Sequence, residues 1–324
     1  MASPFDEFEV DRALRPSRDQ AFDLEQTLNA VVALYARVPG DAFTANSLGP
    51  ERFGHGVVIG ARGLVVTIGY LITEAEEVML LTNDRRQVPA RVVGYDQVTG
   101  FGLVSALEPL DLPAMPLGDS RKLASGDAVI VAGGGGLSHA LAGRLIARQP
   151  FAGYWEYLLD EALFTAPGHP HWSGAAVIGP GGALMGVTSL QMNQMRPDGR
   201  TPIINMSVPI ELLPPILDDL ARGQLMREPR PWLGLLSQEA DEGVMVLSVT
   251  PGGPADRGEL RRGDVILAVD GQTITSLADF YTRLWALGPA GVAAPLRVER
   301  DGDVFDVEIR TIDRASRLRR TQSS

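Results

Sequence analysis

Short apolar segments separated by turn residues dominate the chain from residue 31 onward. Many are bounded by Gly, Pro, Asn or Asp. Short apolar runs separated by such turn residues are typical of β-strands in a barrel or a sandwich. A first series of predicted strands covers residues 31–38, 56–59, 64–68, 77–81, 90–93, 102–107 and 128–132. A second series covers residues 143–148, 157–165, 175–178, 183–190 and 203–208. The pattern therefore predicts a mostly β fold.

Three segments carry apolar residues at helical spacing instead. They are residues 22–31, 209–220 and 276–287. In the second segment, Pro214 and Pro215 predict a kink or a late start, because proline is tolerated only in the first turn of a helix. The third segment carries its apolar stripe on Leu277, Phe280, Leu284 and Leu287.

The length of 324 residues exceeds what one compact core usually holds, so we expect two domains. Residues 223–231 are polar and contain two prolines, and we place the boundary there. The content of 36 Gly and 23 Pro implies many turns, which again favours β structure over a helical bundle.

Charge and composition narrow the function classes. A net charge of -11 and a pI near 4.9 argue against general nucleic-acid binding, which requires a basic face. Since the chain has no cysteine, disulfides, thiol catalysis and cysteine-ligated zinc are excluded. Residues 1–20 lack the apolar core of a signal peptide, and the apolar runs 30–36 and 64–72 are too short to span a bilayer. We expect a cytoplasmic protein without a membrane segment, or a periplasmic one if the translation start is misassigned.

Residues 168–177 (GHPHWSGAAV) have the outline of a serine-nucleophile turn. A proline-containing loop leads to Ser173, and Gly174 follows at once before an apolar strand begins. A serine hydroxyl is a weak nucleophile until a neighbouring base accepts its proton and a third group orients that base. Ser173 is therefore a candidate nucleophile whose partners must be found elsewhere in the chain.

Several segments, taken in order, resemble the HtrA (Deg) family of trypsin-like serine proteases with a C-terminal PDZ domain. They are residues 54–59 (GHGVVI), 116–120 (PLGDS), 123–129 (LASGDAV), 207–212 (SVPIEL), 230–234 (RPWLG), 251–255 (PGGPA) and 258–266 (GELRRGDVI). The resemblance implies a trypsin-like double six-stranded β-barrel followed by a PDZ domain. The implied division is a tail at 1–24, a degenerate protease domain at 25–208, a linker helix at 209–228, a PDZ domain at 229–313 and a second tail at 314–324.

The chain departs from the family pattern at the positions that carry catalysis. Tyr70, within VVTIGYLI, takes the position of the catalytic histidine, and Gly100, within DQVTGFG, takes that of the aspartate. His171 stands at the position of the oxyanion-hole glycine. A neutral phenol is a poor proton acceptor, and glycine has no side chain with which to orient a base. The resemblance therefore implies a pseudoprotease in which Ser173 keeps the nucleophile position without its helpers.

Other residues allow alternative chemistry, each beside a simpler interpretation. The four histidines are His55, His139, His169 and His171. Any of them could act as a substitute base, and the last two could bind a metal, but the sequence names no third ligand. We expect loop packing, no metal and no cofactor. A wide turn is favoured over a phosphate cradle for the glycines at 133–136, and packing over a recognition patch for the aromatic segment 154–157.

The PDZ-like segment keeps the parts that peptide binding needs. Such domains add an extended peptide as a strand at a sheet edge, beside a helix. By resemblance, the backbone N–H groups of Leu233, Gly234 and Leu235 hold the terminal carboxylate of the peptide. Phe280 and Leu284 are assigned to the peptide-binding groove on the predicted helix. We therefore predict that peptide or protein C-termini are the partners.

Three functional hypotheses follow. The first is a pseudoprotease that acts as a peptide- or protein-binding adaptor or chaperone-like scaffold, assembled as a homo-oligomer that the resemblance implies is a trimer. The second is a serine endopeptidase that uses Ser173 with a non-standard base. The third is an inert structural subunit within the oligomer of an active paralogue.

Overall fold

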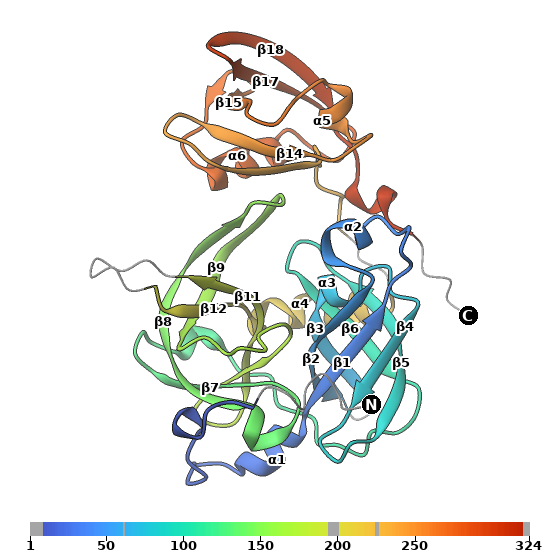
Figure 1. The fold of residues 1–324 in the computed structure, drawn as a ribbon, viewed down its shortest axis with the longest axis vertical. Helices are drawn as coiled ribbons and strands as arrows, with labels where there is room; N and C mark the ends of the chain where they lie inside the picture. Colours follow the sequence, from blue (N-terminus) through green and yellow to red (C-terminus); the bar gives the residue numbers. More distant parts are fainter. Residues whose placement is uncertain (1–8, 61, 194–200, 224–226, 320–324) are drawn as a thin grey trace. The chain divides into compact units, whose positions relative to one another are not determined.

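The structure is a computed structural model that describes residues 9–60, 62–193, 201–223 and 227–319 (Figure 1). The chain divides into two compact units. The first unit comprises Met1–Gln149, Glu161–Leu225 and Arg319–Ser324, and the second comprises Pro150–Asp160 and Met226–Leu318. The segment Pro150–Asp160, called the hairpin segment below, therefore belongs with the C-terminal residues although it lies in mid-chain.

The first unit contains two closed barrels of six strands each, as predicted. The first barrel has the strand order β1-β2-β3-β6-β5-β4. Its strands are β1 (Val31–Arg37), β2 (Glu51–Gly60), β3 (Leu64–Ile68), β4 (Glu77–Leu81), β5 (Gln87–Tyr95) and β6 (Phe101–Ala106). Strand β1 pairs antiparallel with both β2 and β4, which closes the barrel. Leu34, Leu80 and Phe101 are fully buried, as expected where alternate residues of a strand point into the barrel.

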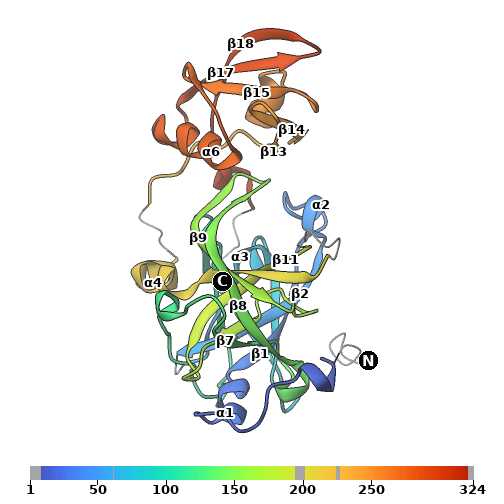
Figure 2. The ribbon, with the colours of Figure 1, turned by 90° about the vertical axis from the view of Figure 1, so that its left-hand side faces the viewer.

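The second barrel has the strand order β10-β11-β12-β9-β8-β7. Its strands are β7 (Ala128–Ala132), β8 (Ala140–Gly153), β9 (Tyr157–Ala166), β10 (Ala176–Ile178), β11 (Leu184–Asn193) and β12 (Ile203–Pro209). Leu145, Leu163 and Val177 are buried in its core cluster. Strand β8 is longer than the predicted segment 143–148, and Figure 2 shows it beside β9 up to their shared turn. That turn is part of the hairpin segment.

The helices of the first unit are short. They are α1 (Leu24–Asn29), α2 (Ala45–Leu48), α3 (Gly69–Ile72) and α4 (Pro214–Ala221), with 3-10 turns η1 (Arg12–Leu14), η2 (Ser120–Lys122), η3 (Gly136–His139) and η4 (Ile210–Leu212). Helix α4 begins at Pro214, because proline in the first turn removes no helical hydrogen bond. This is the late start that the sequence pattern allowed for the segment 209–220. No helix in the described ranges is long and apolar enough to cross a membrane.

The N-terminal residues assigned above to a tail at 1–24 make contacts with the rest of the first unit. Val10 is buried, and its N–H donates to the carbonyl oxygen of Ser138 at 2.8 Å. The side chain of Asp23 accepts a hydrogen bond from the Gln26 N–H at 2.9 Å and so caps α1. The first contact holds Val10 against η3, and the second fixes the start of helix α1.

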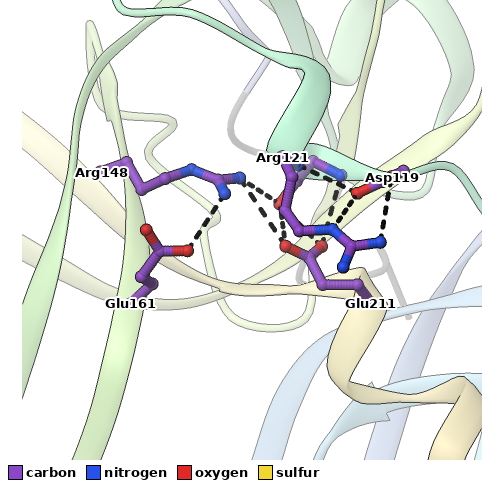
Figure 3. Close-up of polar contacts among 6 residues, drawn as sticks. Asp119, Arg121, Arg148, Glu161 and Glu211 are labelled. Carbon is purple, nitrogen blue, oxygen red and sulfur yellow. Dashed lines mark hydrogen bonds and ion pairs between the residues drawn. The ribbon is translucent and has the colours of Figure 1, made fainter.

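Two of the segments that carried the family resemblance meet in one polar cluster built around the buried Ser120 (Figure 3). Ser120 is fully buried, and its hydroxyl donates to the Glu211 carboxylate at 2.7 Å. The Arg148 Nη2 donates to the Ser120 Oγ at 2.6 Å and lies 3.7 Å from the same carboxylate. Glu161 pairs with Arg148 at 3.1 Å. The cluster joins the loop after the first barrel to η4, since buried polar groups are stable only when their hydrogen bonds are satisfied.

The second unit is a six-stranded antiparallel sheet with two helices. The strand order is β13-β14-β15-β17-β18, and β16 pairs with β15. The elements are β13 (Leu235–Glu239), β14 (Val244–Val249), α5 (Pro254–Arg257), β15 (Val265–Val269), β16 (Gln272–Thr273), α6 (Leu277–Ala286), β17 (Ala293–Arg300), β18 (Asp303–Arg310) and η5 (Arg314–Arg317). Asp264, within the resemblance segment 258–266, is buried and pairs with Arg300 at 2.7 Å. The tail expected at 314–324 begins with η5, in which Arg317 donates to the Pro251 carbonyl oxygen at 3.2 Å.

Replacing Ser120 by alanine is predicted to destabilise the first unit. Ser120→Ala leaves the Glu211 carboxylate and the Arg148 guanidinium without their shared buried hydroxyl, which costs about 1–3 kcal/mol. The measurement is the urea unfolding midpoint followed by tryptophan fluorescence. The control is Arg121→Ala, which removes an exposed ion pair to Asp119 and should leave the midpoint unchanged. Equal midpoints for the two variants would contradict the prediction.

Candidate functional site

Ser173 lies on the turn that precedes β10, and a backbone hydrogen bond links this turn to β2. The carbonyl oxygen of Ser173 accepts a hydrogen bond from the His55 N–H at 2.8 Å. Gly174 has a φ of +78°, and a Cβ at this position would lie 2.1 Å from the carbonyl oxygen of His55. Only glycine fits this close approach. The glycine of the Ser-Gly pair noted in the sequence is therefore also a structural requirement of the turn.

Tyr70, on α3, is hydrogen bonded to the Ser173 hydroxyl. Its Oη lies 2.6 Å from Ser173 Oγ and donates to the carbonyl oxygen of Ser189 at 2.9 Å. Because a phenol has one hydrogen, Ser173 is the donor in the contact between the two hydroxyls. Burial raises the pKa of Tyr70, so the phenol stays protonated at neutral pH. Tyr70 can accept the hydrogen bond of Ser173 but cannot act as a base toward it.

Gly100 lies in the turn between β5 and β6, hydrogen bonded to the first residue of α3, the helix that carries Tyr70. Its carbonyl oxygen accepts the N–H of Gly69 at 2.7 Å, and its φ is +84°. The nearby Asp96 accepts hydrogen bonds from the N–H and the Oγ of Thr99, at 3.0 and 2.8 Å. Gly100, at the position assigned to the orienting aspartate, thus contributes only a backbone hydrogen bond. The carboxylate of Asp96 is used within the turn 96–99.

The backbone N–H of His171 is directed into its own loop. It donates to the Nδ1 of His169 at 3.0 Å. An oxyanion hole requires N–H groups aimed at the place where the substrate oxygen becomes negative. His171 occupies the position that the resemblance assigned to such a donor, and in this structure that donor is engaged by an imidazole.

His169 is fully buried and has both ring nitrogens engaged with the backbone. Its Nε2 lies 3.0 Å from the carbonyl oxygen of His139 and donates to it, because Nδ1 is the acceptor for His171. Burial lowers the pKa of His169 to about 4. Within the described part of the chain, no group of three or more His, Asp or Glu residues could hold a metal ion. His169 is thus a structural imidazole in its loop and has no ring nitrogen left for a metal.

His55 and the glycine run at 133–136 pack against each other. The Nδ1 of His55 accepts the N–H of Gly134 at 3.0 Å, and burial lowers the pKa of His55. A Cβ on Gly134 would lie 2.3 Å from the backbone nitrogen of Ala33 in β1. The run therefore serves a close approach of backbone segments inside the first unit.

The second unit brings together the three residues assigned to carboxylate binding, residues 233–235, here called the carboxylate loop. Their N–H groups all donate to the side chain of Glu156 in the hairpin segment. The distances are 3.0 Å from Leu233 to Oε2, and 2.7 and 2.9 Å from Gly234 and Leu235 to Oε1. Burial raises the pKa of Glu156 to about 7, while the three donors and the charge of Arg314 act to lower it. At pH 8 the carboxylate loop holds an ionised carboxylate.

The residues predicted on the groove helix differ from those that make polar contacts there. Phe280 and Leu284 are fully buried in the core cluster of the second unit, because the apolar stripe of α6 faces the sheet. Tyr281, which the sequence analysis missed, donates its hydroxyl hydrogen to the carbonyl oxygen of Gly153 at 2.8 Å and accepts the N–H of Glu156 at 3.1 Å. Neither Tyr281 nor Glu156 has a motif that distinguishes it from an ordinary core or surface residue.

Two family models match the chain. One is "Trypsin-like peptidase domain", over residues 54–187, and the other is "PDZ domain", over residues 231–311. A "Probable periplasmic serine endoprotease DegP-like" of Pseudomonas fluorescens is 28% identical over 276 residues, which is 80% of this chain and 56% of that protein. A protein of the same description from Pseudomonas fulva is 27% identical over 78% of this chain and 54% of its own length. The chain thus spans about half the length of these curated relatives.

Solved structures give the same picture. The serine endoprotease from Yersinia pestis is 25% identical, with a TM-score of 0.54 over 92% of this chain and 98% of that one. The HtrA-type protease AlgW with a decapeptide is 22% identical with a TM-score of 0.52, over 92% and 98% of the two chains, and shows the same fold. The two barrels and the second unit thus define a protein with a trypsin-like peptidase domain followed by a PDZ domain. The relatives and structural neighbours support the resemblance to the HtrA family that the ordered motifs predicted.

The buried His169 is predicted to make the first unit sensitive to acid. Between pH 6.5 and about 4 the unfolded chain binds a proton at His169 that the folded chain does not, so the free energy of unfolding falls as the pH is lowered. The full window corresponds to roughly 3 kcal/mol. In His169→Gln, which keeps a donor for the His139 carbonyl, urea midpoints between pH 4.5 and 7.5 should depend less on pH than in the parent. An unchanged dependence would show that His169 is not the responsible group.

Proposed function

We propose that this protein is an HtrA-like pseudoprotease that binds peptide or protein C-termini through its PDZ domain, as an adaptor or chaperone-like scaffold. The observation that carries the first half of the proposal is the hydrogen bond from the Ser173 hydroxyl to the neutral phenol of Tyr70. A protonated phenol cannot remove the serine proton, so acyl transfer lacks its general base.

Two further features support the loss of hydrolysis. Gly100 supplies no group that could orient a base, and the N–H of His171 is engaged by His169. Loss of triad members leaves a residual rate of about 10³–10⁴ over water, and loss of one oxyanion donor lowers the rate by about another 10²–10³. Together these terms remove nearly all of the rate enhancement expected of a serine endopeptidase.

The peptide-binding half of the proposal rests on the carboxylate loop. Its three N–H groups converge on one carboxylate, which is the group that a peptide C-terminus presents. The HtrA-type protease AlgW, which shares the fold, has been solved with a decapeptide and with a tripeptide. We carry peptide binding to this chain as a proposal on these two grounds.

Compartment and assembly are further parts of the proposal. The relatives are named as periplasmic proteins, and we propose the periplasm for this chain; the cytoplasmic location expected from the N-terminal sequence has no such support. The trimer implied by the resemblance stays a prediction. Co-purification with an active paralogue would favour the third hypothesis, an inert subunit of a mixed oligomer, over an adaptor of its own.

A fluorophosphonate probe tests the loss of catalysis. Since the Ser173 hydroxyl donates to a group that cannot accept its proton, we expect labelling and casein turnover no higher than in Ser173→Ala. The parent rate should lie at least roughly 10³-fold below that of an HtrA protease with an intact triad. Stoichiometric labelling that disappears with Ser173 would establish the competing hypothesis of an endopeptidase with a non-standard base.

Peptides with free and amidated C-termini test the binding function. A fluorescent peptide with a free terminal carboxylate should bind the full chain on the order of tenfold more tightly than its C-terminal amide, because the amide lacks the charge that the three N–H groups favour. Fluorescence anisotropy gives both dissociation constants. The same affinity for the two peptides would argue against the carboxylate loop as the binding site.

A further inference from the structure

The site that we assign to a peptide C-terminus is already filled by a side chain of the protein. Glu156 is 5% exposed, and its carboxylate takes all three N–H groups of the carboxylate loop. Hydrogen bonds from backbone N–H groups to an ionised carboxylate are stronger than those between neutral groups. A peptide carboxylate would need the same donors, so the two carboxylates cannot bind at once.

The backbone of the hairpin segment also lies where a bound peptide would lie. Ser237, in β13 at the edge of the sheet, donates its N–H to the carbonyl oxygen of Tyr154 at 2.8 Å. On the other side, Tyr281 of α6 bonds to the carbonyl oxygen of Gly153 and to the N–H of Glu156. The segment thus makes main-chain bonds to an edge strand and contacts the adjacent helix, which are the two walls of a peptide groove of this type.

Apolar contacts accompany the polar ones. Ala152 and Leu158, on either side of the turn, are partly buried and pack against the core cluster of the second unit. Trp155 and Tyr157 stack on each other, with ring centroids 5.5 Å apart. The aromatic residues of the turn therefore pack within the hairpin segment, as expected from the sequence, while Ala152 and Leu158 face the core.

The backbone at Glu156 carries a local cost that these contacts offset. Its φ is +58°, in the left-handed region that glycine adopts freely and a residue with a Cβ adopts at some cost. A glycine would satisfy the turn with less strain but would supply no carboxylate. The hydrogen bonds of the Glu156 carboxylate therefore stabilise this residue in a backbone conformation that glutamate does not favour.

We propose that the hairpin segment is an internal ligand of the PDZ groove, in which the side-chain carboxylate of Glu156 substitutes for the terminal carboxylate of a peptide. A peptide C-terminus then binds only after it displaces this segment. The identity of the displacing ligand rests on the proposed function, whereas the occupation of the groove rests on the contacts above. The competing class is a peptide with a free C-terminus and an apolar side chain that replaces Leu158.

Competition of this kind sets the apparent affinity of the groove. An internal ligand acts at a high effective concentration, because its ends are tethered to β8 and β9. The apparent dissociation constant of a peptide is the intrinsic value divided by the fraction of molecules with an open groove. Weakening the internal ligand must therefore tighten peptide binding without any new contact to the peptide.

The test measures peptide affinity of the full chain at pH 8, above the pKa of about 7 of Glu156, by anisotropy of a labelled peptide that ends in a free Leu carboxylate. Glu156→Gly removes the carboxylate and relieves the backbone strain, and it should tighten binding on the order of tenfold or more. Glu156→Gln, which keeps one acceptor oxygen, and Tyr281→Phe, which loses the contacts to Gly153 and Glu156, should give smaller gains. The matched control is Asp160→Asn, an exposed carboxylate of the same segment, which should bind as the parent does.

Hydrogen exchange of the amides at 233–235, read by NMR in the absence of peptide, gives a second and independent measurement. These amides should be protected in the parent and in Asp160→Asn, and they should exchange at least tenfold faster in Glu156→Gly. Unchanged peptide affinity in Glu156→Gly overturns the proposal. If no variant binds any free-carboxylate peptide, the proposed function fails, and the exchange rates alone decide whether Glu156 fills the groove.

Discussion

Two six-stranded sheets that close on themselves are the constraint on which the first unit depends. Strand β1 finds partners in β2 and β4, and β10 finds partners in β7 and β11, so the backbone hydrogen bonds of the barrels are completed between strands. Closure of this kind makes no demand on the side chains of the loops between strands. The positions of Tyr70, Gly100 and His171 lie outside the barrel strands, and residues there can differ widely while the scaffold persists.

The buried polar groups of the loops nevertheless need hydrogen-bond partners, and His169 and His55 supply them. A buried N–H or carbonyl oxygen without a partner costs as much as a lost hydrogen bond. His169 bridges the N–H of His171 and the carbonyl oxygen of His139, and His55 accepts the N–H of Gly134. Imidazoles used in this way are neutral because burial lowers their pKa. His169 is a fixed donor and acceptor within the turn that carries Ser173, and His55 is a fixed acceptor in β2 beside that turn.

In the second unit, too, buried backbone N–H groups require acceptors, here in the carboxylate loop. Successive N–H groups of the carboxylate loop point to one place and require an acceptor there, because buried donors are rarely left unpaired. Glu156 supplies that acceptor from the hairpin segment. The free form of such a groove exposes three donors and apolar surface, so a segment of the same chain that covers both stabilises it. Occupation by Glu156 and the proposed binding of a peptide C-terminus therefore depend on the same three donors.

The sequence determined the class of fold, since apolar runs at strand spacing depend only on local alternation and turn residues. The predicted runs at 31–107 and 128–208 match the twelve barrel strands that the structure describes, and the ordered motifs predicted the resemblance to the HtrA family. It also singled out Ser173, Tyr70 and residues 233–235, because each lies in a contiguous motif. Tertiary structure alone decided that Tyr70 meets Ser173 as an acceptor, that Phe280 and Leu284 belong to the core, and that Glu156 reaches the carboxylate loop. Those facts join residues that are distant along the chain, and local pattern carries no information about which distant donor a given side chain will find.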